Sequence, residues 1–179
     1  MNIPHFSQNF ELESHQHKYT QQVLFVDARD QLQNANDNTK LSFDVVLSGS
    51  NNKDSLNLPP YEQVTRVELK AVCLPKIANE IYYILDIPEF SGRLHSTDNS
   101  GSHESFAVIY YPNTDSIVSP SKGYDFDTKV HEFTPPLKSL SKFRVSFKKY
   151  GGSDITVADI GGTTALRYVN FLLEFTVKQ

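Results

Sequence analysis

The chain has 179 residues, with 17 basic and 21 acidic side chains and a formal net charge of −4. One domain can be this long, and a chain of this mass buries enough apolar surface to fold without a disulfide, a metal or a cofactor. General nucleic-acid binders and polybasic membrane-surface proteins carry an excess of basic charge. Because the signs here are interspersed, the composition argues against both classes.

The cellular compartment is indicated by what the sequence lacks. The single cysteine, Cys73, excludes an intrachain disulfide, and no Asn-x-Ser/Thr glycosylation signal occurs. The first residues have neither the basic start nor the apolar stretch of a secretory signal, and no run is long enough to span a bilayer. We therefore expect a protein of a reducing compartment with no membrane span.

Along the chain, a polar, histidine-containing tail over residues 1–20 precedes one expected domain over residues 21–179. Apolar and polar residues then alternate with a period of two, which is typical of strands in a sheet with one buried face. This alternation is clearest in 67–71, 143–148 and 171–178. Enrichment in β-branched and aromatic residues predicts further strands at 23–27, 41–47, 81–87, 106–111 and 129–134.

The prolines and the scarcity of helical periodicity complete the fold prediction. We expect the prolines to lie between strands, where a missing backbone donor disturbs no ladder, and only residues 136–141 resemble one helical turn. Residues 91–103 and 150–164 are expected to form long loops. These features predict an all-β, antiparallel, eight-stranded single jelly-roll (Greek-key) sandwich with long loops.

Two groups of residues could bind a metal ion. His15 and His17 offer imidazoles, but no glutamate follows them as in metal-binding jelly rolls of the cupin type, so we interpret them as part of a polar tail. Asp125 and Asp127, with Asp115 nearby and Asp98-Asn99 as a second group, offer hard oxygen ligands for calcium. Neither group has the regular ligand spacing of an EF-hand loop, so we interpret these residues as solvated turns.

Catalytic motifs are not apparent. The sequence contains no Gly-x-Ser-x-Gly elbow and no Gly-x-x-x-x-Gly-Lys-Ser/Thr loop, and its six histidines are scattered. Cys73 lies among apolar residues of an expected strand, which favours an inert core thiol. We therefore predict that the protein is not an enzyme.

The one local basic run contains Lys142, Arg144 and Lys148, which alternate with apolar residues. On a strand these three cations share the outward face. Such a face is usually solvated, and the functional alternative is a surface for an anionic partner.

The stretches 64–76, 81–89, 106–111, 135–145 and 170–175 resemble the small single-jelly-roll capsid proteins of nucleocytoplasmic large DNA viruses, which include minor capsid and penton components. The resemblance covers roughly residues 40–178 and consists of strand and turn patterns without a catalytic motif. It implies a structural component of an icosahedral capsid, either a minor capsid (cement) protein or a penton. The implied partners are the major capsid protein, other minor capsid proteins and, for a penton, further copies of this chain as a pentamer. The implied locations are the virion and, during assembly, the host cytoplasm.

Partner binding is expected in the tail, in the loop over 91–103 and on the basic face. The residues concerned are His15, His17, Tyr19, Arg93, His95, His103, Lys142, Arg144 and Lys148. Two other functions stay open: a sugar- or calcium-binding jelly-roll module that uses Asp125 and Asp127, and a metal-dependent enzyme of the cupin type.

Overall fold

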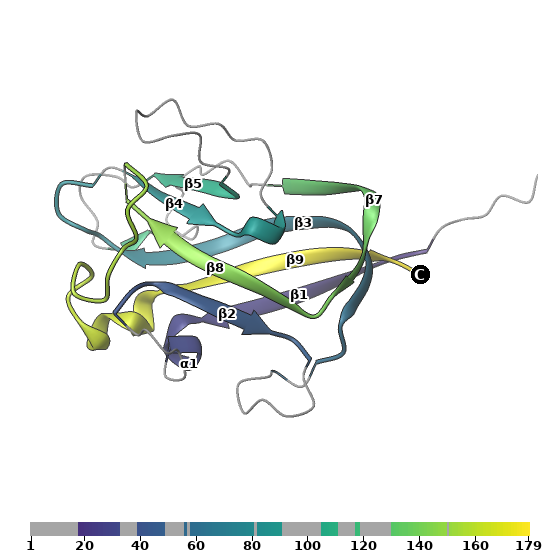
Figure 1. Cartoon of the computed structure of the whole chain (residues 1–179), viewed down its shortest axis with the longest axis horizontal. Helices are drawn as coiled ribbons and strands as arrows, with labels where there is room; N and C mark the ends of the chain where they lie inside the picture. The colour runs from purple at the N-terminus through teal and green to yellow at the C-terminus, as the bar shows by residue number, and fades with distance from the viewer. Residues whose placement is uncertain are drawn as a thin grey trace, which may run out of the picture.

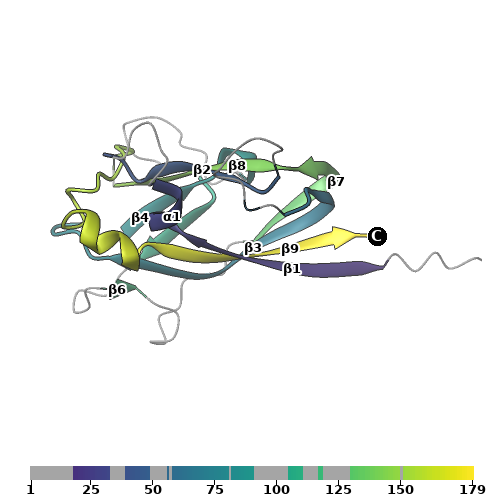
Figure 2. The same cartoon turned by 90° about the horizontal axis from the view of Figure 1, so that it is seen from below.

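A computed structural model describes residues 18–32, 39–48, 56, 58–80, 82–90, 105–110, 117–118, 130–149 and 151–179. Two antiparallel sheets face each other (Figures 1 and 2). The first sheet contains β1 (Tyr19–Asp27), β9 (Asn170–Lys178), β3 (Tyr61–Pro75), β6 (Ile117–Val118) and β7 (Val130–Leu140). The second contains β2 (Ser42–Val46), β8 (Lys142–Lys148), β4 (Tyr82–Asp86) and β5 (Ala107–Tyr110). Among the described residues, the helical segments are α1 (Ala28–Leu32) and the 3-10 turns η1 (Pro88–Phe90) and η3 (Thr163–Tyr168).

The strand pairing is nested. β1 pairs with β9, β2 with β8, β3 with β7 and β4 with β5, as in a long hairpin that has been rolled up. β6 and β7 pair with opposite ends of β3, so together they occupy one position in this scheme. Eight strand positions in two sheets with nested pairing make a jelly roll. The predicted all-β, antiparallel jelly-roll sandwich is confirmed.

The core lies between the sheets and follows the predicted alternation. In β9 the inward side chains Phe171, Leu173, Phe175 and Val177 are buried, and the residues between them are partly exposed. In β8 the apolar residues of 143–147 are fully buried in the same alternating way. Each strand therefore contributes one apolar face to a shared core, which is why the period-two pattern identified these strands.

One local prediction is wrong. Residues 136–140, expected to form a helical turn, belong to β7, where Leu137 pairs with Val64 and Leu140 with Tyr61. Pairing with β3 outweighs the weak helical tendency of these residues. Pro135 and Pro136 therefore lie inside a strand, at a shift in the register between β3 and β7, and Pro75 is the last residue of β3. β7 lies at the edge of its part of the sheet, where proline is tolerated.

The ends of several elements also differ from the expectation. β1 begins at Tyr19, which we had placed in the tail, and the short helix α1 was not predicted. The segment 151–162, expected as a loop, consists of turns with isolated bridges from Lys148 to Asp154 and from Lys40 to Thr156. In the described part of the chain, no helix has the length and apolar character needed to cross a bilayer.

Candidate interaction surfaces

β1 forms one edge of the five-stranded sheet. It pairs with β9 in an unbroken register from Tyr19 opposite Lys178 to Asp27 opposite Asn170. Within the described ranges, no strand pairs with its other side. Figure 2 shows the two layers edge-on, with β1 beside β9 in the lower layer and β2 and β8 in the upper one. In the part of the chain that the structure describes, this side of β1 is therefore available for backbone pairing.

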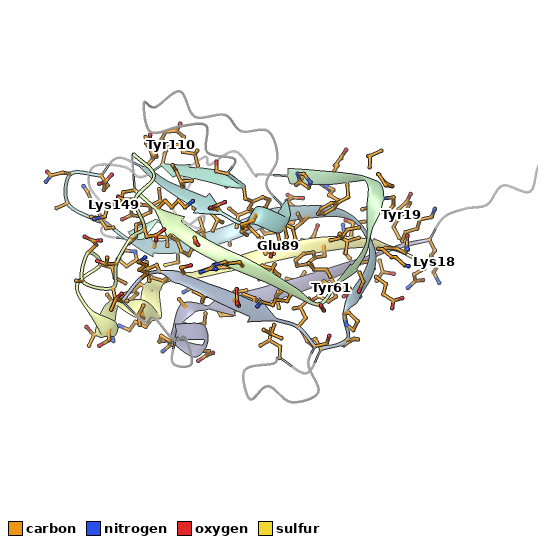
Figure 3. The ribbon with its side chains drawn as sticks, in the orientation of Figure 1. Lys18, Tyr19, Tyr61, Glu89, Tyr110 and Lys149 are labelled. Atoms are coloured by element: carbon orange, nitrogen blue, oxygen red, sulfur yellow. The ribbon has the colours of Figure 1, made fainter. Side chains whose placement is uncertain are left out.

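The outer face of β1 is apolar. Leu24 and Val26 point into the core and are buried, whereas Tyr19, Val23 and Phe25 point outward and are 55%, 59% and 59% exposed. Three of the six large hydrophobic side chains that are exposed in the described structure thus lie on this one strand. Figure 3 shows Tyr19 at the end of the sandwich where the C-terminus also lies.

The other free edges of the two sheets are shorter, covered or interrupted. The edge of β2 is partly covered, because the backbone N–H groups of Leu56 and Leu58 donate to the carbonyls of Val46 and Leu47. β5 has only four residues, and β7 contains Pro135-Pro136. Short strands and prolines are common means of protecting sheet edges. β1 has neither.

An open groove of about 480 Å³ lies beside the start of β1. Tyr19, Gln21, Thr65, Arg66, Glu132, Phe133, Thr134 and Thr176 line it. The groove thus joins β1, β9, β3 and β7 on the outer face of the sheet. Its lining mixes aromatic, hydroxyl and charged side chains, and through Tyr19 it adjoins the apolar strip of β1.

The middle of the same outer face is charged and internally neutralised. The carboxylate of Glu68 accepts a hydrogen bond from the guanidinium of Arg66 at 2.7 Å and lies 3.0 Å from the ammonium of Lys70. The ammonium of Lys70 is also 3.3 Å from Glu174, and the hydrogen bond to Glu68 raises the pKa of Lys70. The two basic and two acidic side chains thus form ion pairs with one another. The outer face of this sheet therefore has an apolar strip on its edge strand β1 and a group of neutralised charges at its centre.

The predicted basic face of β8 exists, but it is not a positive field. Lys142 and Arg144 are exposed and Lys148 is partly exposed on the outward side, as expected. The ammonium of Lys142 lies 2.7 Å from Asp44, and that of Lys148 lies 2.6 Å from Asp86. The acidic partners come from the neighbouring strands β2 and β4, far away in the sequence. The sequence of residues 142–148 alone therefore suggests more net positive charge than the folded surface carries.

Arg144 has an acidic neighbour through its backbone. Its N–H donates to both carboxylate oxygens of Glu89 at 3.1 Å, at the point where β4 has ended and η1 begins. Glu89 lies beside the middle of β8 (Figure 3). The Glu89 carboxylate thus supplies an acceptor for the Arg144 N–H beyond the last pair between β4 and β8, Asp86 with Ser146.

Cys73 is partly exposed, so the predicted core position is wrong. It follows the buried Val72 in β3, and its side chain points to the opposite, outer face. Burial raises the pKa of the thiol, which therefore stays protonated at neutral pH.

Most of the other predicted site residues lie outside the described residues. These are His15, His17, Arg93, His95, His103, Asp98, Asn99, Asp115, Asp125 and Asp127. Within the part of the chain that the structure covers, no group of three or more His, Cys, Asp or Glu side chains is placed to hold a metal ion.

The local sequence pattern does not predict the free edge of β1. The signal is present in the sequence, because residues 19–26 contain no charged residue, proline or glycine. What the sequence does not show is that this segment is an edge strand, since that depends on pairing with β9 at the other end of the chain.

No protein-family model matches the chain, and no curated protein sequence matches it.

Proposed function

We propose that this protein is a structural subunit of the icosahedral capsid of a large DNA virus, in which it binds other capsid proteins as a minor capsid (cement) protein or a penton. The observation that carries the proposal is the nested jelly-roll pairing of β1 with β9, β2 with β8, β3 with β7 and β4 with β5. Viral capsid subunits are one of the main classes of protein built on this fold. The sequence resemblance to single-jelly-roll capsid proteins supports this class over the others.

The distribution of surface chemistry is also compatible with a shell subunit. Shell subunits need a rigid core with contact surfaces on its edges and outer faces. Here the apolar strip of Tyr19, Val23 and Phe25 and the adjoining groove provide one such surface. The balanced face of β8, with its two ion pairs to Asp44 and Asp86, can provide complementary polar contacts to a second protein.

The location in a shell is tested by protein quantification on purified virus particles from the source of this sequence. A shell subunit should be present at a fixed copy number relative to the major capsid protein and should stay with the shell after nuclease treatment. Absence from particles, or loss in proportion to the nucleic acid, would contradict the proposal. The mass of the purified chain then separates the two roles, because a penton forms a closed fivefold ring and a cement protein does not.

A sugar-binding module is the second candidate, favoured by one aromatic pair. Tyr82 of β4 and Tyr110 of β5 lie opposite each other with ring centroids 5.8 Å apart, and Tyr110 is 61% exposed. Exposed aromatic rings can stack on sugar rings. Titration with a glycan panel and with calcium tests this candidate, and Tyr110→Ala should abolish any glycan binding seen. Lack of binding to either ligand would remove it.

A further inference from the structure

We propose that the free edge of β1 is a self-association surface, through which two copies of this chain pair antiparallel and join their five-stranded sheets across a twofold axis. The backbone direction of β1, its lack of protective features and its side-chain pattern all favour such pairing. The inference goes beyond the proposed function and does not depend on it, because the purified chain alone can test it.

Among the described residues, none pairs with the backbone groups on the free side of β1. The N–H of Ala28 donates to the carbonyl of Val169 at 2.9 Å, and the N–H of Gln179 donates to the carbonyl of Lys18 at 2.8 Å. In an antiparallel ladder, alternate residues direct both backbone groups to the same neighbour. The even-numbered residues of β1 therefore bond to β9, and the odd-numbered residues direct N–H and C=O to the free side. These odd-numbered residues include Tyr19, Gln21, Val23 and Phe25.

Nothing within β1 discourages pairing with another strand. Natural sheets protect their edges with charged side chains, prolines, bulges or very short strands. β1 has nine residues in an unbroken register, and its first eight contain no charged side chain and no proline. A single lysine near the middle would be enough to protect it, and position 23, where the side chain is exposed, holds valine.

The side-chain pattern of β1 suits a second copy of the same strand. A twofold axis at Gln22 places Tyr19 opposite Phe25 of the second copy, and Gln21 opposite Val23 of the second copy. In both pairs the backbone N–H and C=O groups point toward the second copy, and the side chains lie on the outer face of the sheet. Aromatic cross-strand pairs such as Tyr19 with Phe25 stabilise antiparallel sheets. The apolar strips of the two molecules then become one continuous surface.

The charges at the two ends of β1 agree with an antiparallel arrangement. Lys18 precedes the strand and Asp27 ends it, so antiparallel pairing about Gln22 places Lys18 of one copy opposite Val26 of the other, one residue from Asp27, with the two charged side chains on opposite faces of the sheet. Asp27 also pairs with Arg29 of its own chain. We therefore expect the proximity of Lys18 and Asp27 between the two copies to add little to the stability of the dimer. Parallel pairing would instead place like charges together. Charge and pattern thus favour a closed, isologous dimer.

The test is sedimentation of the purified full chain over a concentration series, with variants at position 23. Val23→Lys places a charge on the free edge, and Val23→Pro removes an N–H that the β9 ladder does not use. Both variants should keep the thermal unfolding midpoint of a folded monomer and weaken dimerisation by roughly tenfold or more. Tyr110→Lys is the matched control, since it places lysine at another exposed position on the edge strand of the other sheet.

Amide hydrogen exchange provides the second readout. In the dimer, the amides of Gln21, Val23 and Phe25 should become protected as concentration rises, while those of β5 should not change. A dimer that is lost in the position 23 variants and kept in Tyr110→Lys supports the proposal. A monomer at every concentration, a pentamer, or a dimer insensitive to both position 23 variants would overturn it. None of these results would decide whether the chain is part of a capsid, which the particle analysis tests separately.

Discussion

Glu68 and Glu174 lie directly opposite each other on β3 and β9, and both carboxylates are within ion-pair distance of the same ammonium group, that of Lys70. Like charges directly opposite on neighbouring strands destabilise a sheet. Glu68 is only 7% exposed, so water can offset little of this repulsion. Lys70 therefore allows two acidic residues to face each other in the centre of the outer surface.

Lys70→Met should lower the free energy of unfolding by about 1 kcal/mol, because the two glutamates then repel each other without the intervening cation. Chemical denaturation of the wild type and the variant measures the loss. Adding Glu174→Gln to Lys70→Met removes one of the opposed charges and should recover most of the stability. If the double variant were as unstable as Lys70→Met, lost packing of the lysine stem would be the cause, and the electrostatic explanation would be wrong.

Phe90 connects the two sheets from the 3-10 turn η1. It is fully buried, and its ring centroid lies 5.1 Å from that of Phe143 in β8 and 5.8 Å from that of Phe175 in β9. Phe90→Ala should lower the unfolding free energy by about 3–5 kcal/mol, because it leaves a cavity between the sheets. Phe25→Ala, at an exposed phenylalanine, is the control and should change monomer stability far less. Comparable losses in the two variants would show that Phe90 is not central to the core.

The contrast between β8 and β7 shows what a sequence pattern can predict. β8 alternates strictly between polar residues and the buried Phe143, Val145 and Phe147, so its state and its buried face follow from local sequence. The end of β7 has no such alternation, and it becomes a strand because Leu137 pairs with Val64. That contact depends on the path of the whole chain, which a local pattern does not contain.

The same distinction explains the outcome for the candidate surfaces. The outward direction of Lys142, Arg144 and Lys148 was predictable from the period of two. Their neutralisation was not, because Asp44 and Asp86 come from strands that become neighbours only in the folded sheet. The exposed strip on β1 was not predictable for a related reason. Whether an uncharged strand has a free edge depends on which strands pair with it in the folded sheet.

Tyr83 fixes the connection between β3 and β4. Its hydroxyl is buried, accepts a hydrogen bond from the backbone N–H of Ile77 at 2.8 Å and donates to the carbonyl of Pro75 at 2.7 Å. Tyr83→Phe keeps the ring but removes both bonds, and should lower the unfolding free energy by about 1–3 kcal/mol. Hydrogen exchange at the amide of Ile77 should become faster in the variant. Tyr110→Phe, at an exposed tyrosine, is the control; an unchanged amide at Ile77 in Tyr83→Phe would show that the hydroxyl does not fix this turn.

Asp159 makes the contacts that join Lys149, Thr156 and Asp159 dependent on pH. A hydrogen bond from Lys149 at 2.7 Å, with further bonds from the backbone N–H and the hydroxyl of Thr156, lowers the pKa of this carboxyl from 3.8 to about 2. Because the folded pKa is the lower one, the ionised carboxylate stabilises the fold above about pH 4, and this contribution is lost as the pH falls toward about 2.

Asp159→Asn should therefore lower the unfolding free energy at neutral pH by on the order of 1 kcal/mol, a value that allows for solvent screening of this partly exposed side chain. The difference between wild type and variant should shrink through the interval between about pH 4 and about pH 2, because the wild-type carboxyl becomes protonated there. Denaturation curves at several pH values measure it. Asp44→Asn is the control, at an exposed aspartate that pairs with Lys142 across β2 and β8, and should show a smaller loss at neutral pH. A difference for Asp159→Asn that is independent of pH would mean that the asparagine disturbs the turn sterically and that the charge of Asp159 has no part in holding it.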